Sequence, residues 1–426
     1  MRDPGAVRSQ PVNASVLAVT RDDGPTAADA AEGRGDIWIA VAIGALAVFA
    51  YVIAGWGVPT VYDYYGRLAE AFVHGRYWLT TDPPWLNELL ACGDGRWCVA
   101  YPPLPAILAI PLLFLGTATA QDVVSQVCGG ASAGVLYLAL RAYGAPRWIA
   151  LTGALLSAFG TTLFFTSADG RSWYAAHAVA MLWTSVAFLI ASRGGPGWGI
   201  GAAVGLAALA RLPVAAAVPA LALLAARRSG TPFPRTFVRI VAGGLPFLLL
   251  YVGYDLLRWG TVTDVGYARL TEGDFFFDHG LFSLSYIPRH FYAIFVEPPD
   301  FVPNVWYFLR PRFVGMSLFL TTPALLYVFA GLQGVRRSTI VAATALAAAL
   351  VLLPDVTHGT VGFAQLGYRF SIDAQPFLIA LAVGGDAARG GVWRSRPSIL
   401  FLVACAIAVA FNIYLTIAII HYGWWQ

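Results

Sequence analysis

The sequence contains no lysine, and all 27 of its basic residues are arginines. We attribute this absence to a compositional bias of the source genome. Charged residues of either sign are scarce as well, at 12% of the chain against roughly a quarter in soluble domains. Because ionisable side chains are expensive in hydrocarbon, this scarcity favours a membrane protein over a soluble one. The net charge of +4 is small and the arginines are scattered, so no nucleic-acid partner is predicted.

Cysteine is also rare, with four residues in the chain. Cys128 and Cys405 lie in apolar segments and are expected to be inert packing residues. Cys92 and Cys98 flank a short polar loop and are close enough to form a disulfide if that loop faces an oxidising compartment. Two free thiols are the open alternative. A cleavable signal peptide is not evident, because the polar residues 1–36 precede the first apolar run.

Apolar residues make up 58% of the chain and are grouped in long runs. Residues 37–56 carry no charge and are long enough to cross about 30 Å of hydrocarbon as a helix. Further apolar segments fall near 102–116, 120–140, 148–166, 173–192, 198–210, 212–226, 237–256, 313–334, 339–354, 375–388 and 398–420. The pattern predicts an all-α polytopic membrane protein, a bundle of roughly 10–12 spanning or half-spanning helices with interfacial helices in its exterior loops.

Three of these segments, 102–116, 198–210 and 212–226, are too short to cross alone. The last two form a hairpin around Arg211, Leu212 and Pro213. Non-helical backbone at membrane depth is tolerated only where protein or a cavity covers it. The hairpin therefore predicts a protein-lined cavity.

The distribution of arginine orients the chain by the positive-inside rule. Residues 1–36 are predicted to be a disordered cytoplasmic tail, and 37–426 a single transmembrane domain in the plasma membrane. The long exterior loops are then about 57–101, 257–312 and 355–374, and they hold most of the acidic residues. An active site is expected on this extracytoplasmic face.

The first exterior loop opens with VYDYYGRLAEAF at 61–72, in which Leu68, Ala71 and Phe72 share one helical face. This pattern predicts an amphipathic helix at the membrane interface. Asp63 stands at its start, where an aspartate often caps a helix. The functional alternative is a general base that meets a lipid-bound substrate.

The order of several motifs resembles the GT-C glycosyltransferases, particularly bacterial relatives of the protein O-mannosyltransferases (glycosyltransferase family 39) and of the lipid A aminoarabinose transferase. The aromatic-flanked Asp63 is followed by GRYWL at 75–79 and VAYPPLP at 99–105. GLAALARLP at 205–213 is similar to the short-helix hairpin of that group, and GYRFSID at 367–373 to a late feature of it. The resemblance covers about 37–390 and rests on order and spacing.

The resemblance implies that Asp63 is the catalytic base and that a polyprenyl-phosphate sugar is the donor, generally without a metal or other cofactor. The acceptor would be a glycan, glycolipid or protein. The O-mannosyltransferases carry an acidic pair at this point, whereas Tyr64 follows Asp63 here, which weakens the case for their protein acceptor.

Transfer from a lipid phosphate requires cations beside the carboxylate, and arginine binds phosphate bidentately. The exterior candidates are Arg171, Arg211, Arg289 and Arg369. Arg369 could instead pair with Asp373, four residues later on a helix.

Asp169 and His177 mark the start of another exterior helix. A helix cap and a buried histidine are the plain interpretation, and contacts around the sugar the functional one. The acidic run at 272–279 lacks metal-ligand spacing and is interpreted as a solvated loop.

Two other functions remain open on the sequence. Broken helices are also typical of transporters, so a flippase of lipid-linked sugar intermediates is one alternative, although the two halves show no internal repeat. A non-catalytic GT-C-like scaffold is the other.

Overall fold

The computed structural model describes residues 27–303, 306, 308–389 and 392–423 of the chain. Its contacts divide the chain into two compact units, Met1–Trp38 and Ile39–Gln426. Most of the predicted tail, 1–26, lies outside the described residues. Residues 27–36 are helical, not disordered, because the alanine-rich stretch at 27–31 has high helix propensity and extends the first helix backwards.

Among the described residues, seven helical segments are long and apolar enough to cross a membrane. They are Gly33–Gly55 of α1 (Ala27–Gly55), α4 (Thr117–Tyr143), α7 (Ser172–Ser192), η2 with α9 (Leu212–Ala217 and Val218–Ser229), α10 (Phe233–Trp259), α15 (Thr339–Val356) and α17 (Ile399–Tyr422). The multi-span, all-α architecture is thereby confirmed.

Other apolar helices are bent or short. α5 (Arg147–Phe159) and α6 (Leu163–Asp169) form a pair bent by 48°. The shorter elements are α3 with η1 (Leu104–Ala109 and Ile110–Leu115), α8 (Gly197–Ala208), η5 with α14 (Pro323–Leu326 and Tyr327–Leu332) and α16 (Gln375–Ala387). The predicted apolar segment 313–334 is thus not one helix, since a short α13 (Leu318–Thr321) ends before Pro323, which lacks an N–H and restarts the chain as a 3₁₀ turn.

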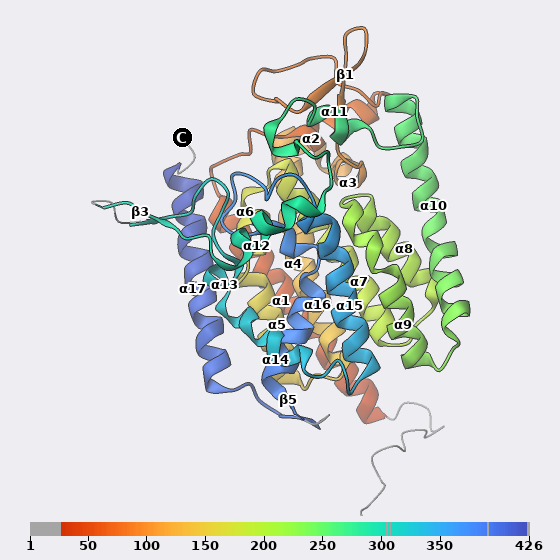
Figure 1. Ribbon diagram of the computed structural model, residues 1–426, viewed down its shortest axis with the longest axis vertical. Coiled ribbons are helices and arrows are strands. Elements are labelled where there is room, and N and C mark those ends of the chain that lie inside the picture. Colours follow the sequence, from red (N-terminus) through yellow and green to blue (C-terminus); the bar gives the residue numbers. More distant parts are fainter. Residues whose placement is uncertain (1–26, 304–305, 307, 390–391, 424–426) are drawn as a thin grey trace, which may run out of the picture. The chain divides into compact units, whose positions relative to one another are not determined.

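Glycines bring the helices of the second unit close together. α4 and α7 pack along each other near its middle, and α8 lies against both α7 and α10 (Figure 1). A Cβ on Gly134 of α4 would come within 2.4 Å of the Ala40 carbonyl oxygen of α1, and one on Gly201 of α8 within 1.9 Å of the Ile240 oxygen of α10. Small residues that let backbones approach are the usual means of helix packing in membranes.

The remaining elements are short and join the helix ends. Those between α1 and α4 are α2 (Tyr64–Val73) and the hairpin β1–β2 (Leu89–Gly93 and Arg96–Val99). Those after α10 are α11 (Gly266–Leu270), η3 (Phe275–Phe277), η4 (Leu284–Tyr286), α12 (Ile287–Phe295), β3–β4 (Asp300–Phe301 and Leu309–Arg310) and η6 (Arg369–Ile372). A last hairpin, β5–β6 (Ala388–Arg389 and Val392–Trp393), precedes α17.

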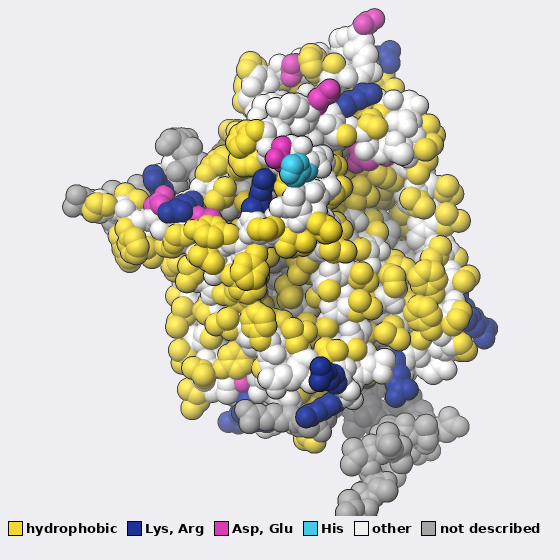
Figure 2. All heavy atoms as spheres, in the orientation of Figure 1, with side chains coloured by type: hydrophobic (Ala, Val, Ile, Leu, Met, Phe, Trp, Pro, Cys, Tyr) yellow, Lys and Arg dark blue, Asp and Glu magenta, His cyan; other side chains and the backbone are white. Residues whose placement is uncertain are grey.

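The three exterior loops predicted from the sequence meet at one end of the bundle, because residues of 65–101, 264–282 and 355–370 line a single cavity. The opposite end is basic: Arg228 at the end of α9 donates to the Tyr143 carbonyl oxygen at the end of α4 (2.6 Å). Figure 2 shows a broad hydrophobic middle on the face in view, with arginines at both ends and most acidic side chains at the end away from β5.

Candidate active site

A cavity of about 530 Å³ opens at the end of the bundle where the exterior loops meet. Its polar lining comes from five places: the flanks of hairpin β1–β2, the start of α7, the apex between α8 and η2, the α11 region, and the chain from the end of α15 to η6. The side chains that carry chemistry there are Glu88, His177, Arg211, Asp264, Asp274, Asp355, His358 and Arg369. The cavity predicted from the α8–η2 hairpin is therefore present, and Arg211 at the hairpin apex faces it.

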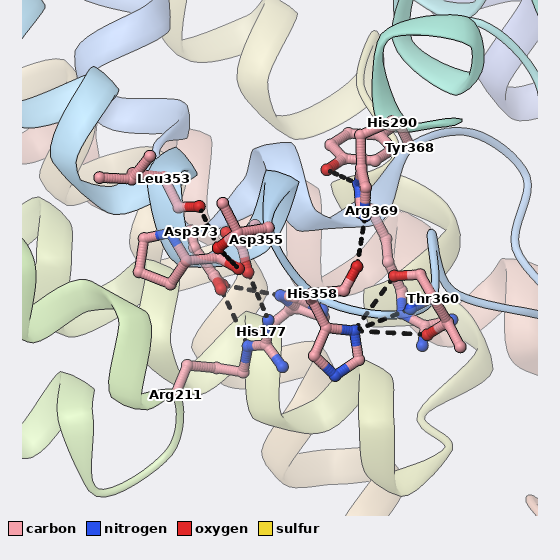
Figure 3. A network of polar contacts seen from close by, with 12 residues as sticks. His177, Arg211, His290, Leu353, Asp355, His358, Thr360, Tyr368, Arg369 and Asp373 are labelled. Atoms are coloured by element: carbon pink, nitrogen blue, oxygen red, sulfur yellow. Dashed lines mark hydrogen bonds and ion pairs between the residues drawn. The ribbon is translucent and has the colours of Figure 1, made fainter. Parts of the chain in front are cut away.

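Arg211 is fixed by two carboxylates from different elements (Figure 3). Its Nε lies 2.9 Å from Asp373 Oδ2, and its Nη2 lies 3.3 Å from Asp355 Oδ1. Burial by itself would raise the pKa of Asp373, but Arg211 and His177 together hold that pKa below its usual range. The hairpin thus places a cation in the wall whose position is determined by buried partners.

His177, one turn into α7, bonds to the same Asp373. Its Nδ1 lies 2.7 Å from Asp373 Oδ1, while its buried Nε2 has no hydrogen-bond partner within the described structure. His177 lines the cavity and Asp373 does not. The ring therefore stands in front of the carboxylate, and its unsatisfied edge is available to a polar ligand.

Arg369 is the second cation of the cavity and differs from Arg211 in its surroundings. It is 9% exposed, and its Nη1 donates to the Phe363 carbonyl oxygen (2.5 Å), while its Nε has no hydrogen-bond partner among the described residues. No carboxylate in the described part of the chain forms an ion pair with it. Asp373, the i+4 partner considered on the sequence, is occupied by Arg211 and His177 instead.

Aromatic rings cover Arg369, whose guanidinium carbon lies 5.4 Å from the ring centroid of Phe370 and 5.6 Å from that of Tyr174. Burial lowers the pKa of Arg369, but a guanidinium stays protonated in proteins. A buried positive charge without an anionic partner is costly, so this wall is prepared for an anion.

Glu88 supplies a carboxylate in the same lining, and it was not predicted from the sequence. The Trp173 indole donates to its Oε2 (2.6 Å), and its backbone N–H donates to the Tyr64 hydroxyl (3.0 Å). Burial raises the pKa of Glu88 to about 7, and the Trp173 hydrogen bond and the charge of Arg369 limit that rise. The available sequence signal was local: an acidic residue directly before a short apolar strand that contains Cys92.

The hairpin that follows Glu88 is closed covalently. Leu89 pairs with Val99 at one end of β1–β2, and a disulfide joins Cys92 to Cys98. Tyr101, two residues beyond β2, also lines the cavity, and its hydroxyl accepts from the Trp173 indole (2.7 Å). One indole N–H therefore contacts both chain segments that leave the hairpin.

Asp63 lies outside the described lining of the cavity and is almost wholly buried. Arg67 Nε lies 2.7 Å from its Oδ1, and the Thr117 hydroxyl donates to its Oδ2 (2.6 Å). Asp63 stands at the N-cap position of α2, yet its carboxylate does not cap the helix. Tyr64 bonds to Asn87 and Glu88 through its hydroxyl, and so stands behind the cavity wall.

The other predicted residues lie outside the described lining as well. Arg171 pairs with Asp169 (3.0 Å) and stacks over the Tyr62 ring. Arg289 of α12 donates to two backbone carbonyls, those of Phe276 and Gly359. The structure thus brings three predicted ligands together, Arg211, Arg369 and His177, and separates Asp63, Tyr64, Asp169, Arg171 and Arg289 from them.

One side of the cavity is apolar and partly exposed. Leu212 and Pro213 of η2, Pro354 near the end of α15, and Leu281 and Phe282 between η3 and η4 line it. Phe282 is 55% exposed and Leu212 is 40% exposed. Neither in the cavity nor elsewhere in the described ranges is a group of three or more histidine, cysteine or acidic residues arranged to hold a metal ion.

Comparison with solved structures identifies the class of fold. ArnT from Cupriavidus metallidurans in the apo state superposes with a TM-score of 0.50 at 16% identity, over 84% of this chain and 60% of that one. The chain thus has a fold similar to that of ArnT and spans about 60% of the length of that protein. The protein O-mannosyltransferase branch of the resemblance stays a prediction.

Two further structures are similar at lower scores. ArnT from Cupriavidus metallidurans bound to undecaprenyl phosphate gives a TM-score of 0.48 at 14% identity, over 82% of this chain and 60% of that one. The oligosaccharyltransferase AglB from Archaeoglobus fulgidus, in complex with an inhibitory peptide and a dolichol-phosphate, gives 0.43 at 14% identity, over 89% and 55%. No protein-family model and no curated protein sequence matches the chain.

Proposed function

We propose that this protein is a membrane glycosyltransferase that moves a single sugar from a polyprenyl-phosphate carrier to an extracytoplasmic acceptor. The observation that supports this most directly is Arg369, a buried guanidinium in the wall of the cavity with which no carboxylate of the described residues pairs. A phosphate diester would supply the missing negative charge and accept from the Nε that has no partner. Arg211 and His177 lie in the same wall and would contact the remaining phosphate oxygens.

The rest of the cavity suits the other parts of such a donor. Tyr65, Tyr101, Trp173 and Tyr267 present rings and hydroxyls to the space beside the arginines, where a sugar can stack and donate hydrogen bonds. The exposed apolar side around Leu212 and Phe282 is compatible with an isoprenoid chain. A carrier whose phosphate is held at Arg369 would then have its chain near lipid and its sugar within the protein.

The GT-C resemblance implies Asp63 as the general base, and that role stays a prediction. In the structure both of its carboxylate oxygens are engaged, by Arg67 and Thr117. To act on a substrate in the cavity, Asp63 would have to leave these partners. No metal or other cofactor is part of the proposal, and the acceptor can be a glycan, a glycolipid or a protein.

The direct test is a reconstituted assay with a panel of polyprenyl-phosphate sugars and a membrane extract as acceptor. Arg369→Gln keeps the polar shape and removes the charge. Hydrogen bonds between charged groups contribute about 1.5–3 kcal/mol, so the donor KM should rise about 10- to 100-fold. Arg269→Gln is the matched control, because Arg269 is an exposed arginine of α11 that stacks on Trp259 outside the cavity lining.

Two outcomes would contradict the proposal. Movement of a labelled carrier across vesicles without any glycosylated product would indicate a flippase. Binding of the carrier with neither movement nor product would indicate a non-catalytic scaffold.

A further inference from the structure

We propose that Glu88, and not Asp63, is the base that takes the proton from the acceptor hydroxyl. This inference rests on the proposed glycosyltransferase function and names the residue that would perform its central proton transfer. It begins from position: Glu88 lines the same cavity as Arg369 and Arg211, whereas Asp63 lies outside that lining.

The Glu88 carboxylate is held in place yet retains an available acceptor. Trp173 donates to Oε2, and the backbone N–H of Glu88 donates to the Tyr64 hydroxyl. Oε1 has no hydrogen-bond partner in the part of the chain that the structure describes. A base needs this combination, with one oxygen anchored and the other free to meet a hydroxyl.

Each of the other carboxylates of the cavity lining is engaged by hydrogen bonds or by an ion pair. Asp264 accepts from the Tyr251 hydroxyl through Oδ2 and from the Gly266 N–H through Oδ1. Asp274 lies on an exposed loop and caps η3, and Asp355 is paired with Arg211. Glu88 alone among the described acidic residues of the lining is half-buried, has no cationic partner in contact and keeps an oxygen free.

Glu88 lies within the electrostatic influence of Arg369. The positive charge of Arg369 acts on the Glu88 carboxylate, although the described residues show no ion pair between the two groups, and both line the same cavity. A pKa of about 7, raised by burial, suits a group that must accept and then release a proton near neutral pH. A donor whose phosphate is held at Arg369 would have its sugar in the cavity that Glu88 also lines.

The transfer step then follows from these positions. The acceptor hydroxyl oxygen attacks the anomeric carbon of the sugar while its proton moves to Glu88 Oε1. The bond between the anomeric carbon and the phosphate oxygen breaks, and its electron pair stays on the phosphate, next to Arg369. The products are the glycoside, the polyprenyl phosphate with one added negative charge, and a protonated Glu88, which returns its proton to water.

The experiment compares steady-state transfer by four reconstituted proteins: the wild type, Glu88→Gln, Asp63→Asn and Asp94→Asn. Loss of a general base costs about 10²- to 10⁴-fold in rate. We expect Glu88→Gln to lower kcat by that amount. The donor KM should stay within about threefold of the wild-type value, because Arg369 and Arg211, which would bind the phosphate, are unchanged. Asp94→Asn changes an exposed carboxylate at the tip of the same hairpin and should leave both constants at wild-type values.

Glu88→Asp provides a second measurement if the glutamine variant does not fold. It keeps a carboxylate on a shorter side chain and should retain part of the activity. The inference is overturned if Glu88→Gln transfers at a rate near that of the wild type, or if Asp63→Asn abolishes transfer while Glu88→Gln lowers it less than tenfold. Either result requires an active wild type, whereas a wild type that consumes no donor would contradict the proposed function itself.

Discussion

Arg369 and Asp373 show how single residues take roles that their spacing does not predict. They are four residues apart and could pair along a helix, but η6 is a short 3₁₀ segment and Asp373 faces Arg211 and His177 instead. The buried carboxylate is thereby satisfied from two distant elements, and Arg369 is left with one backbone acceptor. An ion pair within the motif would have neutralised the charge to which we assign phosphate binding.

If Glu88 is the base, its titration predicts how the rate of sugar transfer depends on pH. Burial raises its pKa to about 7, and a base must be deprotonated to act, so kcat should fall as the pH drops through about 7. The groups that face it are Arg369, which keeps its charge, and the tyrosines 64, 101 and 267. Of these, burial raises the pKa of Tyr267 to about 12, well above this range.

A kcat profile between pH 5 and 9 checks this prediction, with the donor saturating. The Glu88→Gln variant should lose the acidic limb and show a flat, low profile. A wild-type limb that persists in the variant would assign the titration to another group.

The hairpin β1–β2 is the element that carries both Glu88 and Tyr101 into the cavity wall, and its disulfide closes it. Cross-linking a loop of this length is worth about 2 kcal/mol by restricting the unfolded chain. Replacing both cysteines, Cys92→Ser with Cys98→Ser, should leave the bundle folded and lower kcat about 3- to 30-fold, because the segments on either side of the hairpin become less ordered.

Two measurements on the double serine variant test this prediction: the rate of sugar transfer and the melting temperature. A large fall in melting temperature would show that the disulfide holds the fold as a whole. Unchanged kcat would show that the Trp173 contacts are sufficient to position Glu88.

Helix α10 offers a matched pair of glycines for testing the close packing of the bundle. A Cβ on Gly243 would lie 2.1 Å from the Trp198 carbonyl oxygen of α8, whereas one on Gly253 would meet nothing within 4 Å. Gly243→Ala should therefore destabilise the protein by about 1–3 kcal/mol through overpacking. Gly253→Ala should be neutral or slightly stabilising, since alanine favours a helix. Thermal unfolding in detergent measures both, and equal effects would contradict the packing argument.

In the whole molecule the three long loops meet at one end of the bundle, and the short connections at the other end carry arginines with few acidic residues, among them Arg147, Arg193 and Arg336. By the positive-inside rule the cavity should open on the extracytoplasmic side. Glu272→Cys and Arg336→Cys place exposed thiols in connections that belong to opposite ends. In intact cells a membrane-impermeant maleimide should label the first and not the second. The reverse pattern would place the cavity in the cytoplasm.

The helical architecture could be predicted from the sequence because its cause is local in the chain. A long apolar run must become a helix in lipid, where each backbone polar group needs a partner within the segment. This reasoning located α4, α7, α10, α15 and α17 to within a few residues. It was less accurate where the sequence contains proline near a helix end, as at Pro323.

By itself, the sequence determined the membrane class, the positions of the spans and the presence of a cavity behind the hairpin at Arg211, because these depend on hydrophobicity and chain direction. Only the tertiary structure decided which polar side chains share that cavity. Arg369, Arg211 and Glu88 are brought together by three loops far apart in the chain, while Asp63 is turned toward Arg67 and Thr117. A local sequence pattern indicates which face of a helix or strand is polar. Which partner a polar side chain meets depends on how the whole bundle packs.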